Sequence, residues 1–380
     1  MASATDKHGE RWLHVVAFDI PTPPAYGGVI DIYYSVKALE QLGIRVHLHT
    51  FNYGRGDVNA LKNLASKVTV YPRRKERKKL LSATPFIVLT RAHPVLLKNL
   101  LKEEYPILFH GLHTTAFLGH PKLTGRKKIV RTHNVEHDYY RGLAYSESSL
   151  WTKLYFYLEA WKLKRWEKTL LNADLLAAIS EKDTAHFRSL HPNVISVAAF
   201  HPNDGVRVPK QTGDYILYHG NLSVVENHVA AMWLVEQVAP HLDVTLMIAG
   251  KEPRQELVDA VEKAGGAELF SDLTVDELHQ LVQGAQVNVL PTFQATGLKL
   301  KLLEALHSGR WCLVNPPMVQ GTGLEELCVV AGNASEMVQA IKELWGKAVP
   351  ADEVAKRMNL LESRFGGKQG AQLLVDAIFS

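Results

Sequence analysis

The sequence predicts an α/β protein with two domains, each built on a parallel β-sheet. The chain has 380 residues, which is long for one core, and 46% of them are hydrophobic, enough to fill two cores. Short apolar runs typical of buried strands alternate with segments of helical periodicity, and this alternation occurs twice. A polar stretch with Pro and Gly, residues 200–213, separates the halves. We therefore expect domains at residues 1–203 and 204–380, with the last helix, about 366–380, as a candidate for packing back on the first domain.

The elements of the first half follow from local signals. The apolar run 12–18 is expected to be a buried strand, and Pro and Gly force a loop over 21–28. Helical periodicity over 30–42 ends at Gly43, a residue that favours a helix C-terminus. The other expected strands are 46–50, 68–71, 107–110, 128–132 and 175–179, and the other expected helices are 94–104, 151–171 and one that starts near Ser180.

The second half repeats the pattern. Its expected strands are 214–219, 244–249, 285–290 and 311–315, and its expected helices are 226–239, 253–264, 274–284, 298–308 and the final segment 351–380. Strands that alternate with helices connect as crossover units, so both sheets are expected to be parallel.

The stretch 290–309 carries the clearest chemical signal. It reads as a buried strand, a turn at Gly297 and a helix that bears Lys299, Lys301 and Glu304. The start of a helix presents free N–H groups and a favourable dipole to anions. The combination predicts a negatively charged ligand such as a diphosphate, with a carboxylate nearby for hydroxyl groups.

Composition excludes several classes of protein. A net charge of +4 argues against a dedicated nucleic-acid partner. Two cysteines form neither a disulfide framework nor a metal site, which favours a reducing cytoplasm, and no set of potential ligands has metal-site spacing. The polar residues 1–11 carry no signal segment, and no run reaches the roughly 18 apolar residues of a membrane span. We expect a cytoplasmic protein, soluble or peripheral at the inner membrane face. No G-x-G-x-x-G follows the first strand, which argues against a dehydrogenase.

Five motifs in order resemble a known family. They are the Pro-rich loop ending in Gly27-Gly28, Tyr218-His-Gly-Asn-Leu-Ser-Val-Val-Glu-Asn227, Met247-Ile-Ala-Gly-Lys-Glu-Pro253, Thr296-Gly-Leu-Lys-Leu-Lys-Leu-Leu-Glu-Ala-Leu306 and Gly321-Thr-Gly-Leu324. Together they resemble the retaining GT-B glycosyltransferases of the GT4, or group 1, type. The resemblance implies two Rossmann-like domains that face a cleft, a GDP- or UDP-hexose donor, no required metal, and a glycan or lipid-linked glycan acceptor in polysaccharide or glycoconjugate synthesis.

Three positions depart from the family pattern. Thr296 stands where the first glutamate of the usual two-glutamate motif is found, so Glu304 alone remains. Asn221 and Glu226 stand where the family has Arg and Lys. The resemblance therefore implies a divergent branch in which Lys299 and Lys301 supply the charge for the diphosphate.

The resemblance implies roles for individual residues. His133, which follows a strand, is expected to face the donor sugar, and Glu304 and Lys301 complete the catalytic candidates. The simpler readings are a structural histidine and a surface glutamate. Small residues after strands let the backbone approach phosphates, although they also simply make turns. The donor-binding candidates are Gly27, Gly28, Gly220, Asn221, Ser223, Gly250, Lys251, Phe270, Ser271, Thr296, Gly297, Leu298, Lys299 and Thr322.

Further polar residues end strands of the first half. His110 or His113 is a candidate for facing the acceptor, and Glu136 and His137 are further candidates in the segment after His133. In parallel sheets, ligands bind at this edge.

Two surface features have competing interpretations. Residues 73–79 carry six basic side chains, which form either a solvated face or a contact with anionic lipid. The apolar stripe Trp151, Leu154, Tyr155, Leu158 and Trp161 is expected to pack in the core, with a membrane or acceptor face as the alternative.

Two other functions compete with glycosyl transfer. One is a nucleotide-sugar epimerase, in which water replaces the sugar acceptor. The other is a non-catalytic GT-B module that binds a glycan or a partner glycosyltransferase, which the departures at Asn221, Glu226 and Thr296 favour.

Overall fold

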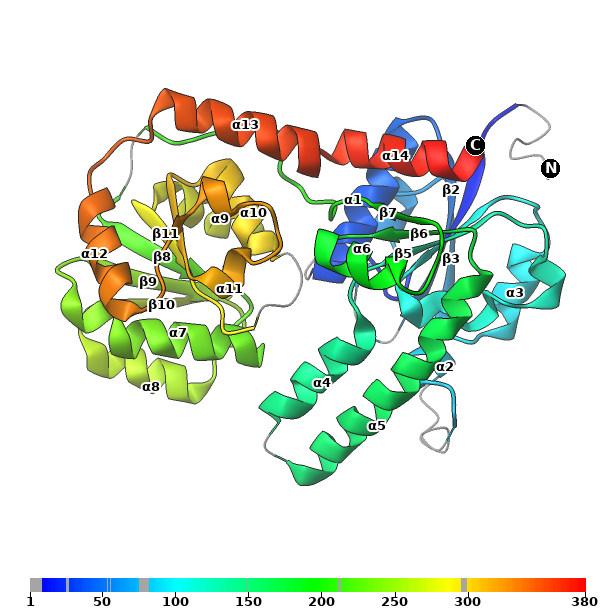
Figure 1. The fold of residues 1–380 in the computed structure, drawn as a ribbon, viewed down its shortest axis with the longest axis horizontal. Helices are drawn as coiled ribbons and strands as arrows, with labels where there is room; N and C mark the ends of the chain where they lie inside the picture. The colour runs from blue at the N-terminus through cyan, green and yellow to red at the C-terminus, as the bar shows by residue number, and fades with distance from the viewer. Residues whose placement is uncertain are drawn as a thin grey trace. The chain divides into compact units, whose positions relative to one another are not determined.

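The computed structural model describes residues 9–24, 27–52, 54, 56–74, 82–147, 149–210, 213–294 and 299–380. The chain forms two compact units, which we describe separately. Unit 1 comprises Met1–Pro202 and Phe365–Ser380, and unit 2 comprises Asn203–Arg364 (Figure 1).

Unit 1 contains a seven-stranded sheet in the order β3-β2-β1-β4-β5-β6-β7, and all neighbouring strands are parallel. After β1 the chain adds strands on one side, and from β4 it adds them on the other. The order therefore reverses between β1 and β4, where open α/β sheets bind ligands. The strands are β1 (Trp12–Val16), β2 (Arg45–Asn52), β3 (Lys67–Pro72), β4 (Ile107–His110), β5 (Lys128–Thr132), β6 (Leu175–Ala178) and β7 (Val194–Ser196).

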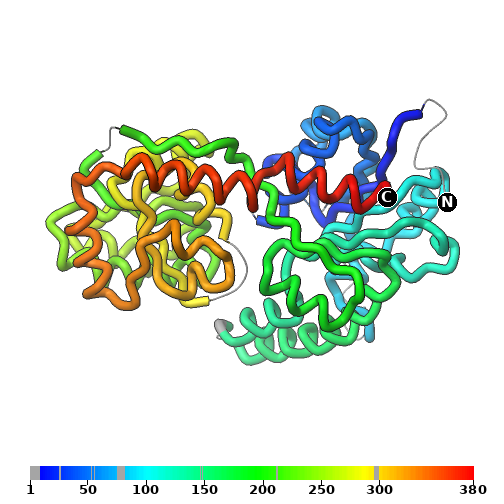
Figure 2. The backbone as a smooth tube through the Cα atoms, turned by 45° about the horizontal axis from the view of Figure 1, so that its top comes forward, coloured from blue at the N-terminus to red at the C-terminus, as the bar shows by residue number. Residues whose placement is uncertain are grey.

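Helices cover both faces of this sheet. They are α1 (Gly27–Gln41), α2 (Phe86–Leu89), α3 (Pro94–Leu100), α4 (Glu136–Ser146), α5 (Leu150–Trp166), α6 (Glu181–Arg188) and α14 (Gly367–Phe379), with the short 3₁₀ helices η1 (Ala60–Asn63), η3 (Leu112–Phe117), η4 (Pro121–Leu123) and η5 (Glu167–Asn172). Figure 2 shows α14, the C-terminal helix, beside α1.

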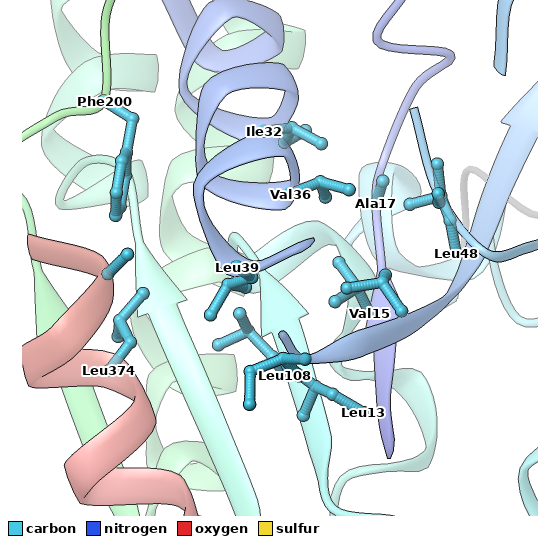
Figure 3. Packing of buried hydrophobic residues seen from close by; sticks show 14 of the residues in the cluster. Leu13, Val15, Ala17, Ile32, Val36, Leu39, Leu48, Leu108, Phe200 and Leu374 are labelled. Carbon is cyan, nitrogen blue, oxygen red and sulfur yellow. The ribbon is translucent and has the colours of Figure 1, made fainter. Parts of the chain in front are cut away.

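The final helix contributes to the core of unit 1. Leu374 of α14 is fully buried in the same cluster as Leu39 of α1 and Phe200 (Figure 3). Leu13 and Leu108 from the central strands complete this layer. The C-terminal residues therefore pack with the first residues of the chain, because α14 buries its apolar face on α1 rather than leaving it in water.

Unit 2 contains a six-stranded parallel sheet in the order β10-β9-β8-β11-β12-β13, which reverses between β8 and β11. Its strands are β8 (Tyr215–His219), β9 (Thr245–Gly250), β10 (Ala267–Ser271), β11 (Val287–Leu290), β12 (Trp311–Val314) and β13 (Val329–Val330). Its helices are α7 (Val225–Gln237), α8 (Gln255–Ala264), α9 (Val275–Gly284), α10 (Leu300–Ser308), α11 (Pro316–Val319), α12 (Ala334–Leu344), α13 (Ala351–Phe365), η6 (Ala239–His241) and η7 (Glu325–Leu327). The prediction of two parallel α/β sheets is confirmed.

The expected burial of the apolar stripe after residue 150 is wrong. Trp151 and Leu154 are largely exposed, because α5 turns Ala160 and Leu163 toward the core instead. The continuous helix expected over 151–171 also ends at Trp166, where a 3₁₀ turn begins. Within the described residues, no helix has the length and apolarity needed to cross a bilayer.

Candidate functional site

The turn after β8 brings two predicted glycines into contact. Gly220 follows β8 and Gly250 ends β9, the neighbouring strand. A Cβ atom on Gly250 would overlap the carbonyl oxygen of Gly220, so only glycine fits at position 250 in this structure. The amide of Gly220 donates to the carbonyl oxygen of Ala249 in β9 at 3.0 Å, which continues the pairing of β8 with β9. The loop therefore packs closely against the end of β9, an approach that glycine permits.

Asn221 organises the start of α7. Its side-chain oxygen accepts from the Ser223 amide at 3.0 Å and from the Ser223 hydroxyl at 2.7 Å. Its carbonyl oxygen accepts from the side chain of Asn227 at 2.9 Å. No side chain caps α7 at Val224. The predicted residues Gly220, Asn221 and Ser223 thus form one turn that leads into an uncapped helix N-terminus, a geometry suited to an anion.

Lys301 lies beside this turn and is half-buried. Its ammonium donates to the Tyr218 hydroxyl at 3.0 Å and to the Asn227 side-chain oxygen at 2.9 Å, and it lies 4.5 Å from the centre of the Tyr218 ring. Burial lowers the pKa of Lys301 to about 7, and the nearby Glu226 carboxylate opposes this shift. A second anion near the ammonium would therefore raise this pKa toward its ordinary value.

Lys299 forms an ion pair with Glu226. The Lys299 ammonium lies 2.8 Å from Glu226 Oε1, and the same oxygen accepts from the Thr292 hydroxyl. The acidic residue that departs from the family pattern is therefore a partner of the lysine expected to compensate for it. Lys299 directly precedes α10 and Lys301 lies within it. Both lysines contact α7, through the neighbouring residues Glu226 and Asn227.

Glu304 faces a different helix. Its Oε1 lies 3.6 Å from the His279 ring of α9, and burial raises the pKa of Glu304 while His279 opposes the rise. A quarter of its side chain remains exposed. This carboxylate is thus partly desolvated, with one oxygen directed at a histidine.

Three of the remaining predicted residues of unit 2 lie at the ends of two neighbouring strands. Lys251 follows β9, and Phe270 and Ser271 end β10. Thr322 lies between two glycines with φ of 72°, accepts from the Leu324 amide at 3.1 Å and donates to Val319 at 2.7 Å. Thr296, Gly297 and Leu298 lie outside the described residues.

His133 of unit 1 belongs to a buried polar group formed by residues from α1 and from the C-terminal ends of β4 and β5. Its Nε2 lies 3.4 Å from Asp31 Oδ2 and 3.2 Å from His110 Nδ1. Asp31 accepts two hydrogen bonds of 2.7 Å from Arg131. Burial alone would raise the pKa of Asp31, but the Arg131 guanidinium holds it below its ordinary value. An ionised carboxylate therefore lies beside His133.

The hydrogen bonds of this group indicate which ring nitrogen of His133 carries the proton. Burial lowers the pKa of His133 to about 4, so the ring is neutral near pH 7. Ser35 donates its hydroxyl to Ile32 at 2.9 Å, which leaves its oxygen to accept from His110 Nε2 at 3.5 Å. His110 Nδ1 then accepts from His133 Nε2, which leaves His133 Nδ1 as an acceptor.

The acceptor nitrogen of His133 points toward the start of α1. It lies 3.3 Å from where a Cβ atom on Gly28 would stand, and that Cβ would also collide with Phe18 at 2.7 Å. A Cβ on Gly27 would meet nothing within 4 Å. Of the two predicted glycines, only Gly28 is required by close packing, and it keeps the space beside His133 open.

A second polar group lies beside the first. Glu136 Oε1 and His113 Nδ1 are 3.7 Å apart, and each is a buried atom that makes no hydrogen bond in the structure. Burial raises the pKa of Glu136 to about 8, and the Arg91 charge opposes this rise. Phe18 stacks on His113 with ring centroids 4.9 Å apart. The pair thus offers buried polar atoms able to bond a hydroxyl group.

The fold also assembles groups of potential metal ligands that spacing along the chain did not indicate. Each group offers ligand atoms within 4.8 Å of one another, namely His14, His47 and His49; Asp31, His110 and His133; and His137, Glu167 and His186.

Hydrogen bonds account for two histidines of the first group. His14 Nε2 meets the Glu103 carbonyl at 3.3 Å, and His14 Nδ1 meets His49 Nε2 at 2.9 Å. His49 Nδ1 meets the Tyr71 hydroxyl at 2.8 Å, and Tyr71 accepts from Asn99 at 2.9 Å. Both ring nitrogens of both histidines are used, so this arrangement needs no ion.

Sequence reasoning missed Asp31, Arg131 and Arg91. Asp31 occupies an ordinary helical position and Arg131 lies within a strand, so neither belongs to a recognisable motif. The one available signal was a charged residue inside an otherwise apolar segment, because buried charges require partners.

The chain is similar to several known proteins. Residues 213–347 match the family model described as Glycosyl transferases group 1. A Klebsiella pneumoniae protein described as an uncharacterized 44.6 kDa protein in the cps region is 24% identical over 370 residues, which cover 87% of this chain and 92% of that protein.

Solved structures match nearly the whole chain. Sucrose-phosphate synthase from Thermosynechococcus elongatus has a TM-score of 0.68 and 14% identity, covering 96% of this chain and 97% of that one. A TarM variant of S. aureus in complex with Fondaparinux, α-GlcNAc-glycerol and UDP has a TM-score of 0.65 and 10% identity, covering 97% and 100%. HepE of Anabaena in complex with UDP has a TM-score of 0.61 and 12% identity, covering 96% and 98%. The chain therefore has the GT-B fold, and its residues 213–347 match a group 1 glycosyl transferase domain, which together support a GT-B glycosyltransferase.

Proposed function

We propose that the protein transfers a hexose from a UDP- or GDP-hexose to a glycan or lipid-linked glycan, with retention of the anomeric configuration, as the GT4 type does. The observation that carries the proposal is the close contact of Gly220 with Gly250 in the turn that leads to α7, with Lys299 and Lys301 beside it. The structures of TarM and HepE that contain UDP are of the same fold, which supports a nucleotide-sugar donor.

In this reaction the bond between the sugar C1 and the diphosphate oxygen breaks, and the acceptor hydroxyl oxygen bonds C1 on the same face. The acceptor proton passes to the departing diphosphate. The start of α7 and the two lysines stabilise the negative charge that develops on that group. The acceptor nitrogen of His133 receives a hydrogen bond from a sugar hydroxyl, and Glu304 receives one from the donor.

Unit 1 is proposed to bind the acceptor. The unpartnered atoms of His113 and Glu136 are suited to hydroxyl groups, and Glu136 is mostly protonated near pH 7 because burial raises its pKa to about 8. We also propose peripheral contact with anionic membrane through the basic run 73–79, of which residues 75–79 lie outside the described residues. No metal is proposed to take part.

A non-catalytic glycan-binding module is the alternative that a specific observation favours. The Glu226 carboxylate neutralises Lys299 at 2.8 Å, which reduces the charge available to a diphosphate. An epimerase would release nucleoside diphosphate without any acceptor.

The test is to incubate the purified protein with UDP- and GDP-hexoses, with and without candidate glycan acceptors, and to measure released nucleoside diphosphate. We expect the acceptor to stimulate release of nucleoside diphosphate, and NMR to show that the product has the same anomeric configuration as the donor. A chelator should not lower the rate of transfer, whereas His133→Ala should lower it. Release of no nucleoside diphosphate from any donor would favour the module. Release that acceptors do not stimulate, with an epimerised sugar, would favour the epimerase.

A further inference from the structure

The helical hairpin formed by α4 and α5 carries an apolar face that the described residues of the chain leave uncovered. The two helices pack side by side and project from the sheet of unit 1 (Figures 1 and 2). Leu150 is 80% exposed, Trp151 84% and Tyr145, near the end of α4, 83%. The exposed large apolar side chains of α5 are Leu150, Trp151, Leu154, Tyr157, Leu158 and Trp161. Their spacing of one, three and four residues confines them to one side of the helix.

The opposite side of α5 is firmly attached to unit 1. Ala160 and Leu163 are buried in the core. Glu159 is fully buried, forms an ion pair of 2.8 Å with Lys162 and accepts from the Phe86 amide at 2.6 Å. Because this side holds the helix in place, the apolar face is fixed in its outward orientation.

The outward face becomes basic at its C-terminal end. Lys164, Arg165 and Lys168 are exposed and continue the same stripe. The Arg165 guanidinium lies 4.8 Å from the centre of the Trp161 ring. The only acidic residue of α5, Glu159, is buried on the other side, so the face carries aromatic, leucine and basic side chains without a carboxylate.

A second source of positive charge lies near this helix. Burial raises the pKa of Tyr155 in α5 to about 12, and the charge of Arg73 opposes the rise, which places Arg73 close to α5. Arg73 is the first residue of the basic run 73–79. The positive charge of Arg73 therefore acts on α5 in addition to the charge of the stripe.

We propose that the α4–α5 hairpin docks on the surface of an anionic lipid bilayer. Trp151 and Leu154 enter the boundary between head groups and acyl chains, and the basic residues contact lipid phosphates. A second copy of the chain fits this face less well, because a two-fold contact through it would bury Lys164 and Arg165 without a carboxylate on the same face. At 17 residues, α5 lies along the surface rather than across the bilayer.

The test is co-sedimentation of the full chain with vesicles of phosphatidylcholine alone or mixed with phosphatidylglycerol. We expect binding to the anionic vesicles, with a blue shift of tryptophan emission. Trp151→Glu should weaken binding at least about tenfold, because it puts a charge in the proposed contact. The matched control Val275→Glu changes a residue that is 75% exposed on α9 and should bind as the wild type does.

Charge is tested separately. Lys164→Gln and Arg165→Gln should each weaken binding about fivefold at low ionic strength, the equivalent of about 1 kcal/mol per basic residue, and less at high salt. Both substitutions are at exposed positions, so folding is preserved and is checked by circular dichroism.

Three results would overturn the proposal. These are failure of the wild type to bind anionic vesicles, wild-type binding by Trp151→Glu, and a dimer that Trp151→Glu converts to a monomer while vesicles bind neither form. The last result would assign the face to a second copy of the chain. Vesicle binding is measured without donor or acceptor, so its absence would leave the proposed transfer reaction standing.

Discussion

The buried pair of Asp31 and Arg131 should be highly sensitive to substitution. Both side chains are almost fully buried, at 2% and 0% exposure, and Asp31 accepts two hydrogen bonds of 2.7 Å from the guanidinium and one of 2.8 Å from the Phe200 amide. Asp31→Ala removes all three and leaves the Arg131 charge without its counter-ion. Breaking such a buried pair typically costs about 3–5 kcal/mol, which is our expected loss of stability.

The exposed pair of Asp138 and Arg141, 3.3 Å apart in α4, is the matched control. Asp138→Ala should cost at most about 1 kcal/mol, because solvent screens exposed pairs. Unfolding of unit 1 is followed in urea by hydrogen exchange of a peptide that spans β5, since two units need not unfold together. Arg131→Met should rescue part of the loss caused by Asp31→Ala, because it removes the uncompensated charge.

The pH dependence of this pair has a definite sign. The pKa of Asp31 is lower in the folded chain than its ordinary value of 3.8, so its stabilisation is fully present above that value and is lost as the pH falls below it. The cost of Asp31→Ala should therefore stay constant between about pH 5 and 8. A cost similar to that of Asp138→Ala, or strictly additive effects with Arg131→Met, would refute the assignment of a coupled buried pair.

Three further predictions concern the donor site. Nucleoside diphosphate binding should take up about half a proton at pH 7, because the pKa of Lys301 is about 7 and a bound diphosphate would raise it. Calorimetry in buffers of different ionisation enthalpy measures this proton uptake, which should disappear in Lys301→Met. Gly250→Ala should lose most nucleotide binding because its Cβ overlaps Gly220, whereas Gly266→Ala, where a Cβ meets only a carbonyl at 3.7 Å, should bind normally. Glu304→Gln should fold normally and lower turnover about tenfold or more in a donor-release assay, and an unchanged rate would remove it from the donor site.

Much of the fold follows from local signals. Parallel strands buried on both faces show as apolar runs such as 12–18, and a Gly after periodic residues marked the helix end at Gly43. β10 was not expected, because Ala267–Ser271 is only half-buried and lacks a continuous apolar run. The stripe on α5 was misjudged because helical periodicity shows that a face is apolar but not what covers it.

The sequence indicated where the candidate site lies better than which residues contact one another there. Turns after parallel strands identified Gly220 and Gly250, since ligands bind at that edge. The partners of the two lysines were not predictable, because Glu226 and Asn227 come from α7 and meet them only in the folded chain. Asp31 was missed for the same reason, as its partner Arg131 is 100 residues away in sequence.

Titration calorimetry with UDP, GDP and ADP tests the donor assignment with a single variant pair. The account predicts that one of these nucleotides binds with one site per chain, that Lys299→Met weakens binding at least about tenfold, and that Lys263→Met, an exposed lysine at the end of α8, leaves it unchanged. If none of the three nucleotides binds, or if Lys299→Met binds as tightly as the wild type, the proposed diphosphate site at the start of α7 is contradicted.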